Sequence, residues 1–330
     1  SKHHDGVTLW DAPGTGTRNT VHRGPKLDIM QAIADAARAN DIRFAVYYSG
    51  GLDWGLDNFR QIETFDDVYD LRPNDAAYSV YAYEHVKDLI DRYQPDILWN
   101  DIEWPDFSKL NDESVDYTLA KLFRYYYDKV PHGLVNDRWG ETHHDFATSE
   151  YQALQESEDA EVWENCRGIG MSFGYNQYET EEHSLTVESA LEHFVDIVSR
   201  GGNLLLNVGP TASGQIPDIQ RKVLEGMGDW MEVNSSAIYE TSKVSELSAS
   251  NLDSDSAWVR FTGTSDRVFA HINGKGDVSF NLTAGVVDEG SAKLLASGNS
   301  VAVSRSGDNV SINLPEADVR GPQVIEFRRA

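Results

Sequence analysis

Short apolar runs alternate with amphipathic stretches over the first two thirds of the chain. The runs are strand-like, being rich in β-branched and aromatic residues or fully apolar. They cover residues 42–49, 96–101, 133–139, 168–175 and 203–210. Helical spacing of apolar residues marks 78–93, 114–129, 186–200 and a long stretch from about residue 217. Nearly continuous apolar strands that alternate with helices predict an α/β fold whose parallel sheet is covered by helices.

Polar and aromatic residues gather where the predicted strands end. Tyr47, Tyr48 and Ser49 close one strand, Asn100 and Asp101 the next, Asn136, Asp137 and Arg138 a third, and Asn207 another. In a (β/α)8 barrel this end of the strands carries the active site. We therefore expect a (β/α)8-like barrel over residues 1–243.

Beyond residue 244 the hydrophobic period falls to two. Short alternating segments are separated by Gly, Asn, Asp and Ser turns, a pattern typical of an antiparallel β-sandwich. We expect a small accessory domain over residues 244–330, with no constellation of reactive groups of its own.

Charge narrows the range of partners. The chain of 330 residues carries 54 acidic and 28 basic side chains, a formal net charge of -26. Such a charge repels nucleic acid and anionic membranes, so neither is expected as a partner. The acidic residues are spread along the whole chain, which suits a hydrated surface in high salt. No window has the roughly eighteen apolar residues that span a bilayer.

The cysteine count and the first residues of the chain bear on disulfides, metal sites and cellular location. The single Cys166 excludes an internal disulfide and a multi-cysteine metal site. No signal peptide is visible in the printed sequence, which favours the cytoplasm over secretion as an expectation.

The segment "ILWNDIEWPD" (97–106) follows a buried strand with indoles and carboxylates. Side chains alternate along a strand, so Trp99 and Asp101 are expected to point the same way. Sugars stack their C–H faces on indoles, and glycoside cleavage needs two carboxyl groups. The alternative is that Trp99 belongs to the core and Asp101 caps the next helix.

Several segments together resemble one family. They are "KHHDG" (2–6), "YYSGGLDW" (47–54), "LWNDIEWP" (98–105), "VNDRWG" (135–140), "TSEY" (148–151), "WENCRGIGMSFGYN" (163–176) and "VDIVSRGGNLLLNVGPTASGQIP" (195–217). The residues of these segments, and the order of the segments along the chain, resemble those of the retaining α-L-fucosidases of glycoside hydrolase family 29. The Leu run of the last segment fits barrel core, and we take that segment as structural.

The resemblance implies a role for each of eight residues. Asp101 corresponds to the catalytic nucleophile, and Glu150 to the general acid/base, with Glu141, Glu161 and Glu164 as nearby alternatives. Contacts to the sugar hydroxyls or ring oxygen are implied for His3, His4, Tyr47, Trp99 and Arg138, and packing on the fucose methyl for Phe173. Tyr48 is an alternative to Tyr47.

No metal or organic cofactor is expected. "HHD" with His143 and His144 could form a metal site, but no carboxylate has the spacing of the common metal motifs. Trp54, Trp104 and Trp139 could form pocket walls or simply pack near the rim.

The sequence also departs from the family. Family members carry a segment before "KHHDG" with the first barrel strands, and the strand count here gives the same deficit, so we expect a barrel incomplete at its N-terminus. Its unpaired edge and bare apolar faces predict self-association into a homo-oligomer through residues 1–50.

The expected function is retaining hydrolysis of terminal α-L-fucose. The alternatives are another retaining glycosidase on the same scaffold and a non-catalytic fucose-binding protein.

Overall fold

A computed structural model describes residues 1–56, 62–64, 66–110, 112, 114–152, 161–251, 257–316 and 320–330. The chain forms two compact units, residues 1–148 and 149–330. The sequence-based boundary near residue 243 falls inside the second unit, where the first strand of the antiparallel region lies. The division into a catalytic part over 1–243 and a sandwich over 244–330 stays a prediction.

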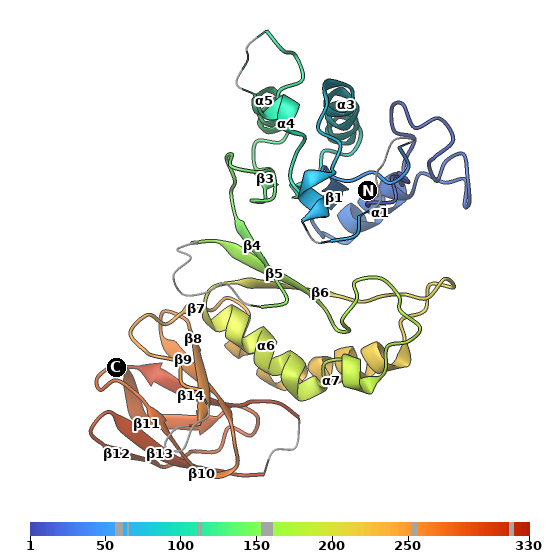
Figure 1. Cartoon of the computed structure of the whole chain (residues 1–330). Coiled ribbons are helices and arrows are strands. Elements are labelled where there is room, and N and C mark those ends of the chain that lie inside the picture. The colour runs from blue at the N-terminus through green and yellow to red at the C-terminus, as the bar shows by residue number, and fades with distance from the viewer. Residues whose placement is uncertain are drawn as a thin grey trace. The chain divides into compact units, whose positions relative to one another are not determined.

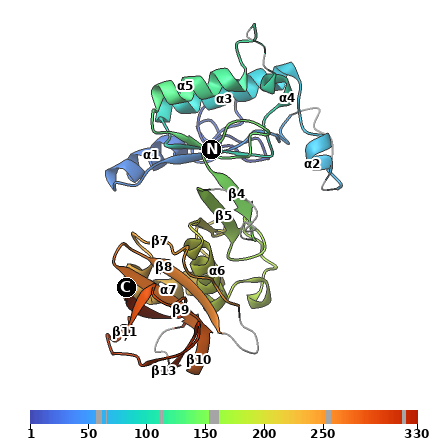
Figure 2. The same cartoon turned by 90° about the vertical axis from the view of Figure 1, so that its left-hand side faces the viewer.

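The first unit is built on a parallel sheet of order β1-β2-β3. Its elements are α1 (Ile29–Ala39), β1 (Ala45–Ser49), α2 (Asp67–Asp70), α3 (Ala76–Tyr93), β2 (Ile97–Asp101), α4 (Asp106–Lys109), α5 (Leu119–Lys129) and β3 (Leu134–Val135). Helices α3 and α5 lie side by side over the sheet (Figure 1, Figure 2). One buried core joins the strands to these helices through residues such as Val46, Leu98, Leu89 and Leu122.

The ends of these helices follow from local hydrogen bonds. Helix α3 begins where the Asp75 side chain accepts from the Tyr78 N–H, and it ends at Gln94, whose φ is 44°. Helix α5 begins at Leu119 and not near residue 114, because Thr118 caps it by accepting from the Lys121 N–H. The first N–H groups of a helix have no partner within the helix, so a side chain that accepts from one of them fixes where the helix begins. The apolar spacing of the sequence, which extends further toward the N-terminus, does not show this.

The second unit combines a small sheet, two long helices and an antiparallel region. Its elements are β4 (Ala147–Glu150, which begins in the first unit), β5 (Trp163–Gly168), η1 (Glu181–His183), α6 (Val187–Ser199), β6 (Asn203–Asn207), α7 (Asp218–Asn234), η2 (Ser235–Ala237), β7 (Ser242–Lys243), β8 (Trp258–Gly263), β9 (Arg267–Asn273), β10 (Gly276–Asn281), β11 (Val287–Leu294), β12 (Val303–Ser306), β13 (Asn309–Leu314) and β14 (Gln323–Arg329). Strands β5 and β6 are parallel, in a sheet of order β4-β5-β6. Helices α6 and α7 lie side by side (Figure 1).

The antiparallel strands form two sheets, of order β11-β14-β9-β8-β7 and β10-β13-β12. One buried cluster draws on both sheets, with Phe261 and Phe327 from the first and Phe280 and Ile312 from the second. Two antiparallel sheets that share a core match the β-sandwich expected from the alternating pattern.

Two of the predicted strands differ most from the observed ones in extent. Residues 169–175 form no strand; the strand is β5, which ends at Gly168. Met171, Phe173 and Tyr175 are exposed in the following loop, so their apolar character does not mark a buried strand. Strand β3 covers only Leu134–Val135 of the expected 133–139.

The described strands of the predicted barrel form two three-stranded sheets and show no closed barrel. The incomplete (β/α)8-like barrel therefore stays a prediction. Among the described helices, none has the length and apolar character that crossing a membrane requires.

Candidate active site

The ends of β1 and β2 bring the expected residues of the first unit to one face. The parallel register places Tyr47 beside Trp99 and Ser49 beside Asp101. Leu98 and Asn100 are buried, whereas Trp99 and Asp101 are only half-buried. Trp99 and Asp101 thus share a face, as the alternation of side chains predicts. Helix α4 begins after Pro105, so Asp101 does not cap it.

The Asp101 carboxylate is fixed through both oxygens. The Tyr47 hydroxyl donates to Oδ2 at 2.7 Å, and Nη1 of Arg138 donates to Oδ1 at 3.0 Å. The backbone N–H of Ile102 also donates to Oδ1, at 3.0 Å. The Asp101 side chain keeps 14% exposure, so a substrate atom can reach it. Charge-assisted bonds from a guanidinium hold a carboxylate in a defined orientation, which a nucleophile requires.

Arg138 is itself oriented on several sides. Its Nε donates to Oγ1 of Thr148 at 2.9 Å, and that hydroxyl donates to Asp137 at 2.7 Å. The guanidinium carbon lies 4.6 Å from the centre of the Trp99 ring. A planar guanidinium stacks well on an indole, so Trp99 and Arg138 form one wall beside the carboxylate.

His3 and His4 lie next to Tyr47. The His3 ring stacks on Tyr47 with centroids 5.4 Å apart, and the His4 and His3 ring centroids are 4.0 Å apart. Nδ1 of His4 lies 2.7 Å from Oγ of Ser49. Burial, with the neighbouring His3, lowers the pKa of His4 to about 4, and burial also lowers the pKa of His3. At neutral pH the His4 ring therefore offers one donor and one acceptor, as sugar hydroxyls require.

A strained turn follows Asp101. Ile102 and Glu103 have φ values of 57° and 59°. The left-handed region is unfavourable for a β-branched residue, so this turn is held by its surroundings. The backbone N–H groups of Gly50 and Gly51 donate to the Asp101 carbonyl at 3.1 and 3.3 Å.

The Glu103 carboxylate, which belongs to this turn, pairs with Arg72 and Lys109, each at 2.9 Å. Sequence reasoning missed this turn, and its only visible signal is the pair of glycines in "YYSGGLDW".

The alternatives left open by the sequence have distinct surroundings. Tyr48 is buried, and its hydroxyl lies 3.0 Å from Nδ1 of His85, away from Asp101. Trp104 and Trp139 are buried and pack on each other, whereas Trp54 is half exposed and its ring lies 5.7 Å from His4.

The histidines that were considered as a possible metal site also have defined surroundings. Nε2 of His143 lies 3.1 Å from the Tyr127 hydroxyl and 3.4 Å from the Asp145 carboxylate. Within the described part of the chain, no three His, Cys, Asp or Glu side chains gather as a ligand set.

Glu150 and Phe173 belong to the second unit. Glu150 is the exposed last residue of β4, and Tyr151 after it has a φ of 57°. The Tyr151 ring lies 5.3 Å from Phe173, which is 36% exposed. Of the alternatives, Glu141 and Glu161 are exposed and Glu164 is half-buried on β5. The six other expected residues come together in the first unit: His3, His4, Tyr47, Trp99, Asp101 and Arg138.

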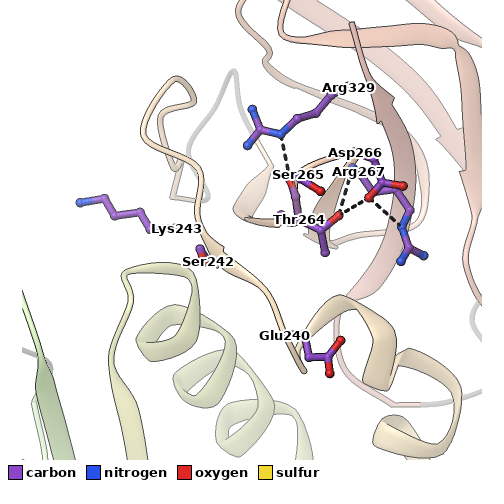
Figure 3. A pocket seen from close by; sticks show the side chains of 9 residues that line it. Glu240, Ser242, Lys243, Thr264, Ser265, Asp266, Arg267 and Arg329 are labelled. Carbon is purple, nitrogen blue, oxygen red and sulfur yellow. Dashed lines mark hydrogen bonds and ion pairs between the residues drawn. The ribbon is translucent and has the colours of Figure 1, made fainter.

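A separate hollow lies on the antiparallel region of the second unit (Figure 3). Its lining includes Lys243, Thr264, Asp266, Arg267 and Arg329. Nε of Arg329 donates to the Thr264 carbonyl at 3.0 Å, and Oγ1 of Thr264 donates to Asp266 at 2.8 Å. None of the residues expected to bind or cleave a sugar lines this hollow.

Comparison with known proteins identifies a family. The family model "Alpha-L-fucosidase" matches residues 1–236. Plasma α-L-fucosidase of Homo sapiens is 34% identical over 248 residues, which cover 73% of this chain and 51% of the relative. The α-L-fucosidase of Dictyostelium discoideum is 30% identical over 250 residues, covering 73% and 52%. This chain belongs to the α-L-fucosidase family, glycoside hydrolase family 29, and spans about half the length of these curated relatives.

Solved structures extend the match over nearly the whole chain. The α-fucosidase of Thermotoga maritima superimposes with a TM-score of 0.82 at 40% identity, covering 99% of this chain and 74% of that one. A further structure of that protein is described as a complex with fucose. The α-L-fucosidase isoenzyme 1 of Paenibacillus thiaminolyticus gives a TM-score of 0.78 at 27% identity, covering 100% and 82%.

Proposed function

We propose that this chain carries the catalytic site of a retaining α-L-fucosidase, which hydrolyses terminal α-L-fucosyl residues of a glycan or simple fucoside. The observation that carries the proposal is the Asp101 carboxylate, held by Tyr47 and Arg138 at the end of β2. Family membership supports the reaction class, and the relative described in complex with fucose supports the sugar.

Two carboxyl groups perform the reaction in two steps. Asp101 attacks the anomeric carbon while Glu150 gives its proton to the leaving oxygen, so the glycosidic bond breaks and a fucosyl ester forms. Glu150 then takes a proton from water, which displaces Asp101 and releases fucose with its original configuration. This mechanism requires carboxyl groups about 5 to 5.5 Å apart. It needs no metal and no organic cofactor.

The remaining residues bind the sugar. Polar groups of His3, His4, Tyr47 and Arg138 surround the Asp101 side of the site and supply donors and acceptors for hydroxyls and the ring oxygen. Trp99 offers an apolar face beside them. Phe173, exposed in the second unit, is assigned to the fucose methyl.

Self-association is part of the same proposal. Several apolar side chains of residues 1–50 are exposed, among them Leu27 at 50%, Ile33 at 49% and Ile42 at 62%. A contiguous exposed apolar patch favours burial against another copy of the chain, and the proposal is that these side chains contribute to such a patch. Light scattering at micromolar concentration should give a mass above that of one chain. A stable monomer would contradict self-association and would leave the proposed catalytic function unaffected.

Substrate preference tests the function. The protein should hydrolyse 4-nitrophenyl α-L-fucoside much faster than the matching β-D-galactoside and α-D-xyloside. NMR of the first-formed sugar should show the α anomer. The β anomer would contradict retention, preference for another glycoside would contradict the substrate, and saturable fucose binding without turnover would identify a non-catalytic fucose-binding protein.

A further inference from the structure

The backbone ladder between β2 and β3 stops before the catalytic end of the sheet. Only Leu134 and Val135 pair with β2, opposite Ile97 and Leu98. At the next residue a side chain takes over: Oδ1 of Asn136 accepts from the Asn100 N–H at 3.0 Å, and its Nδ2 donates to the Asn100 carbonyl at 2.9 Å. An asparagine side chain carries the same donor and acceptor as a peptide group. It therefore continues the ladder with a side chain in place of backbone.

The Asn100 side chain makes a second connection. Its Nδ2 donates to the Arg138 carbonyl at 2.7 Å and to the Glu103 carbonyl at 2.9 Å. The first bond reaches the chain after β3, and the second fixes the strained turn that follows Asp101. Asn100 and Asn136 are both fully buried. Loss of either amide would leave buried backbone groups without a partner, which is costly.

These four hydrogen bonds surround the residues that carry the proposed chemistry. Asp101 follows Asn100 directly, and Arg138 lies two residues after Asn136. The carboxylate and the guanidinium meet at 3.0 Å, although Asp101 ends β2 and Arg138 lies in the chain that follows β3. Direct backbone pairing would set a different spacing between β2 and the chain after β3, because the Asn136 side-chain amide is inserted between them.

We infer that Asn100 and Asn136 are positioning residues, whose side-chain amides form a clamp that sets Asp101 and Arg138 at their working distance. The inference rests on the proposed function of Asp101. Neither asparagine need touch the sugar. The residue type is specific: aspartate cannot donate to the carbonyl, alanine offers neither bond, and glutamine is one methylene too long for the same gap.

The test compares two buried asparagines. Asn136→Ala removes the two hydrogen bonds of the clamp that the Asn136 side chain makes to the Asn100 backbone. Asn19→Ala is the matched control in the same unit, because Asn19 is also buried, accepts from the N–H groups of Val21 and His22 at 3.1 and 3.0 Å, and donates to the Gly16 carbonyl at 3.1 Å. Melting temperature, kcat and KM on 4-nitrophenyl α-L-fucoside are measured for both variants and for the wild type.

Both variants should melt at lower temperature than the wild type. Only Asn136→Ala should lose kcat, by about 10²-fold with a smaller change in KM, since displacement of a reacting group by about 1 Å has that effect. A merely structural role would affect both variants alike. Asn136→Ala with the kcat of the wild type, or equal loss of kcat in Asn19→Ala, would overturn the inference. If Asn136→Ala does not fold, Asn136→Ser is measured in its place, with the same expectation.

A crystal structure separates this inference from the proposed function. In the Asn136 variant, the distance from Asp101 Oδ1 to Arg138 Nη1 should exceed about 3.5 Å, beyond hydrogen-bond range. An unchanged distance of 3.0 Å would overturn the clamp even if the wild type cleaves fucosides. A wild type that cleaves no fucoside would contradict the proposed function, while this distance would still decide the clamp.

Discussion

A single methyl group at Gly51 should disable the site. The Cβ of an alanine there would lie 1.8 Å from the Ile102 carbonyl oxygen and 2.8 Å from its carbon. Cβ atoms essentially never approach closer than 3.0 Å, so one of the two backbones must move by about 1.2 Å. The obstacle is backbone of a strained turn, which cannot rotate away as a flexible side chain can.

Two hydrogen bonds connect the displaced backbone to Asp101. The Gly51 N–H donates to the Asp101 carbonyl, and the Ile102 N–H donates to its carboxylate. A shift of about 1 Å in a reacting group costs about 10²-fold in rate, or about 2.7 kcal/mol in the activation barrier. Overpacking should also lower the free energy of unfolding by about 1 to 3 kcal/mol.

The assay is kcat on 4-nitrophenyl α-L-fucoside, with chemical denaturation for stability. Gly228→Ala is the control: it lies exposed in helix α7, and its added Cβ meets nothing within 4 Å. The same substitution should there raise stability by about 0.5 to 1 kcal/mol and leave kcat unchanged. Gly51→Ala with the kcat and stability of the wild type would refute the reasoning about the turn.

Three further predictions concern the nucleophile, salt and pH. Asp101→Gly should lose several orders of magnitude in kcat with the fold intact, and azide should partly restore turnover by giving β-L-fucosyl azide; near wild-type turnover would remove Asp101 from its role. With a net charge of -26, the melting temperature should be higher in 1 M NaCl than in dilute buffer, since the Debye length falls from about 10 Å at 0.1 M to about 3 Å; a flat or falling trend contradicts this. Burial lowers the pKa of His271 to about 3, so from about pH 6.5 down to about 3 the unfolded state binds more protons and stability falls as pH falls. His271→Gln should lose less stability across that window, and an identical pH dependence would argue against a buried neutral imidazole.

The sequence was informative where a local rule decides the outcome. Alternation along one strand is enough to place Trp99 and Asp101 on a common face, and the parallel register then adds Tyr47. The period of two beyond residue 244 likewise led to antiparallel sheets, because each short segment has one buried face.

The rest depends on partners that are distant in the sequence. Strand β3 ends early because the Asn136 side chain bonds to the backbone of Asn100, 36 residues away. The pattern of apolar and polar residues gives no sign of this bond. The turn at Ile102 has a conformation that its residue type disfavours, so propensity predicts the opposite. The loop after Gly168 resembles a strand in composition, but Met171, Phe173 and Tyr175 in it are exposed.

Trapping of the glycosyl-enzyme tests the central claim most directly. A 2-deoxy-2-fluoro-α-L-fucosyl fluoride retains a good leaving group while the fluorine slows both steps, so the intermediate of a retaining enzyme accumulates. Mass spectrometry should show one fluorofucosyl group per chain, and peptide mapping should place it on Asp101. A label on another carboxylate, or no label from a protein that still hydrolyses the aryl fucoside, would contradict the assignment of Asp101 as the nucleophile.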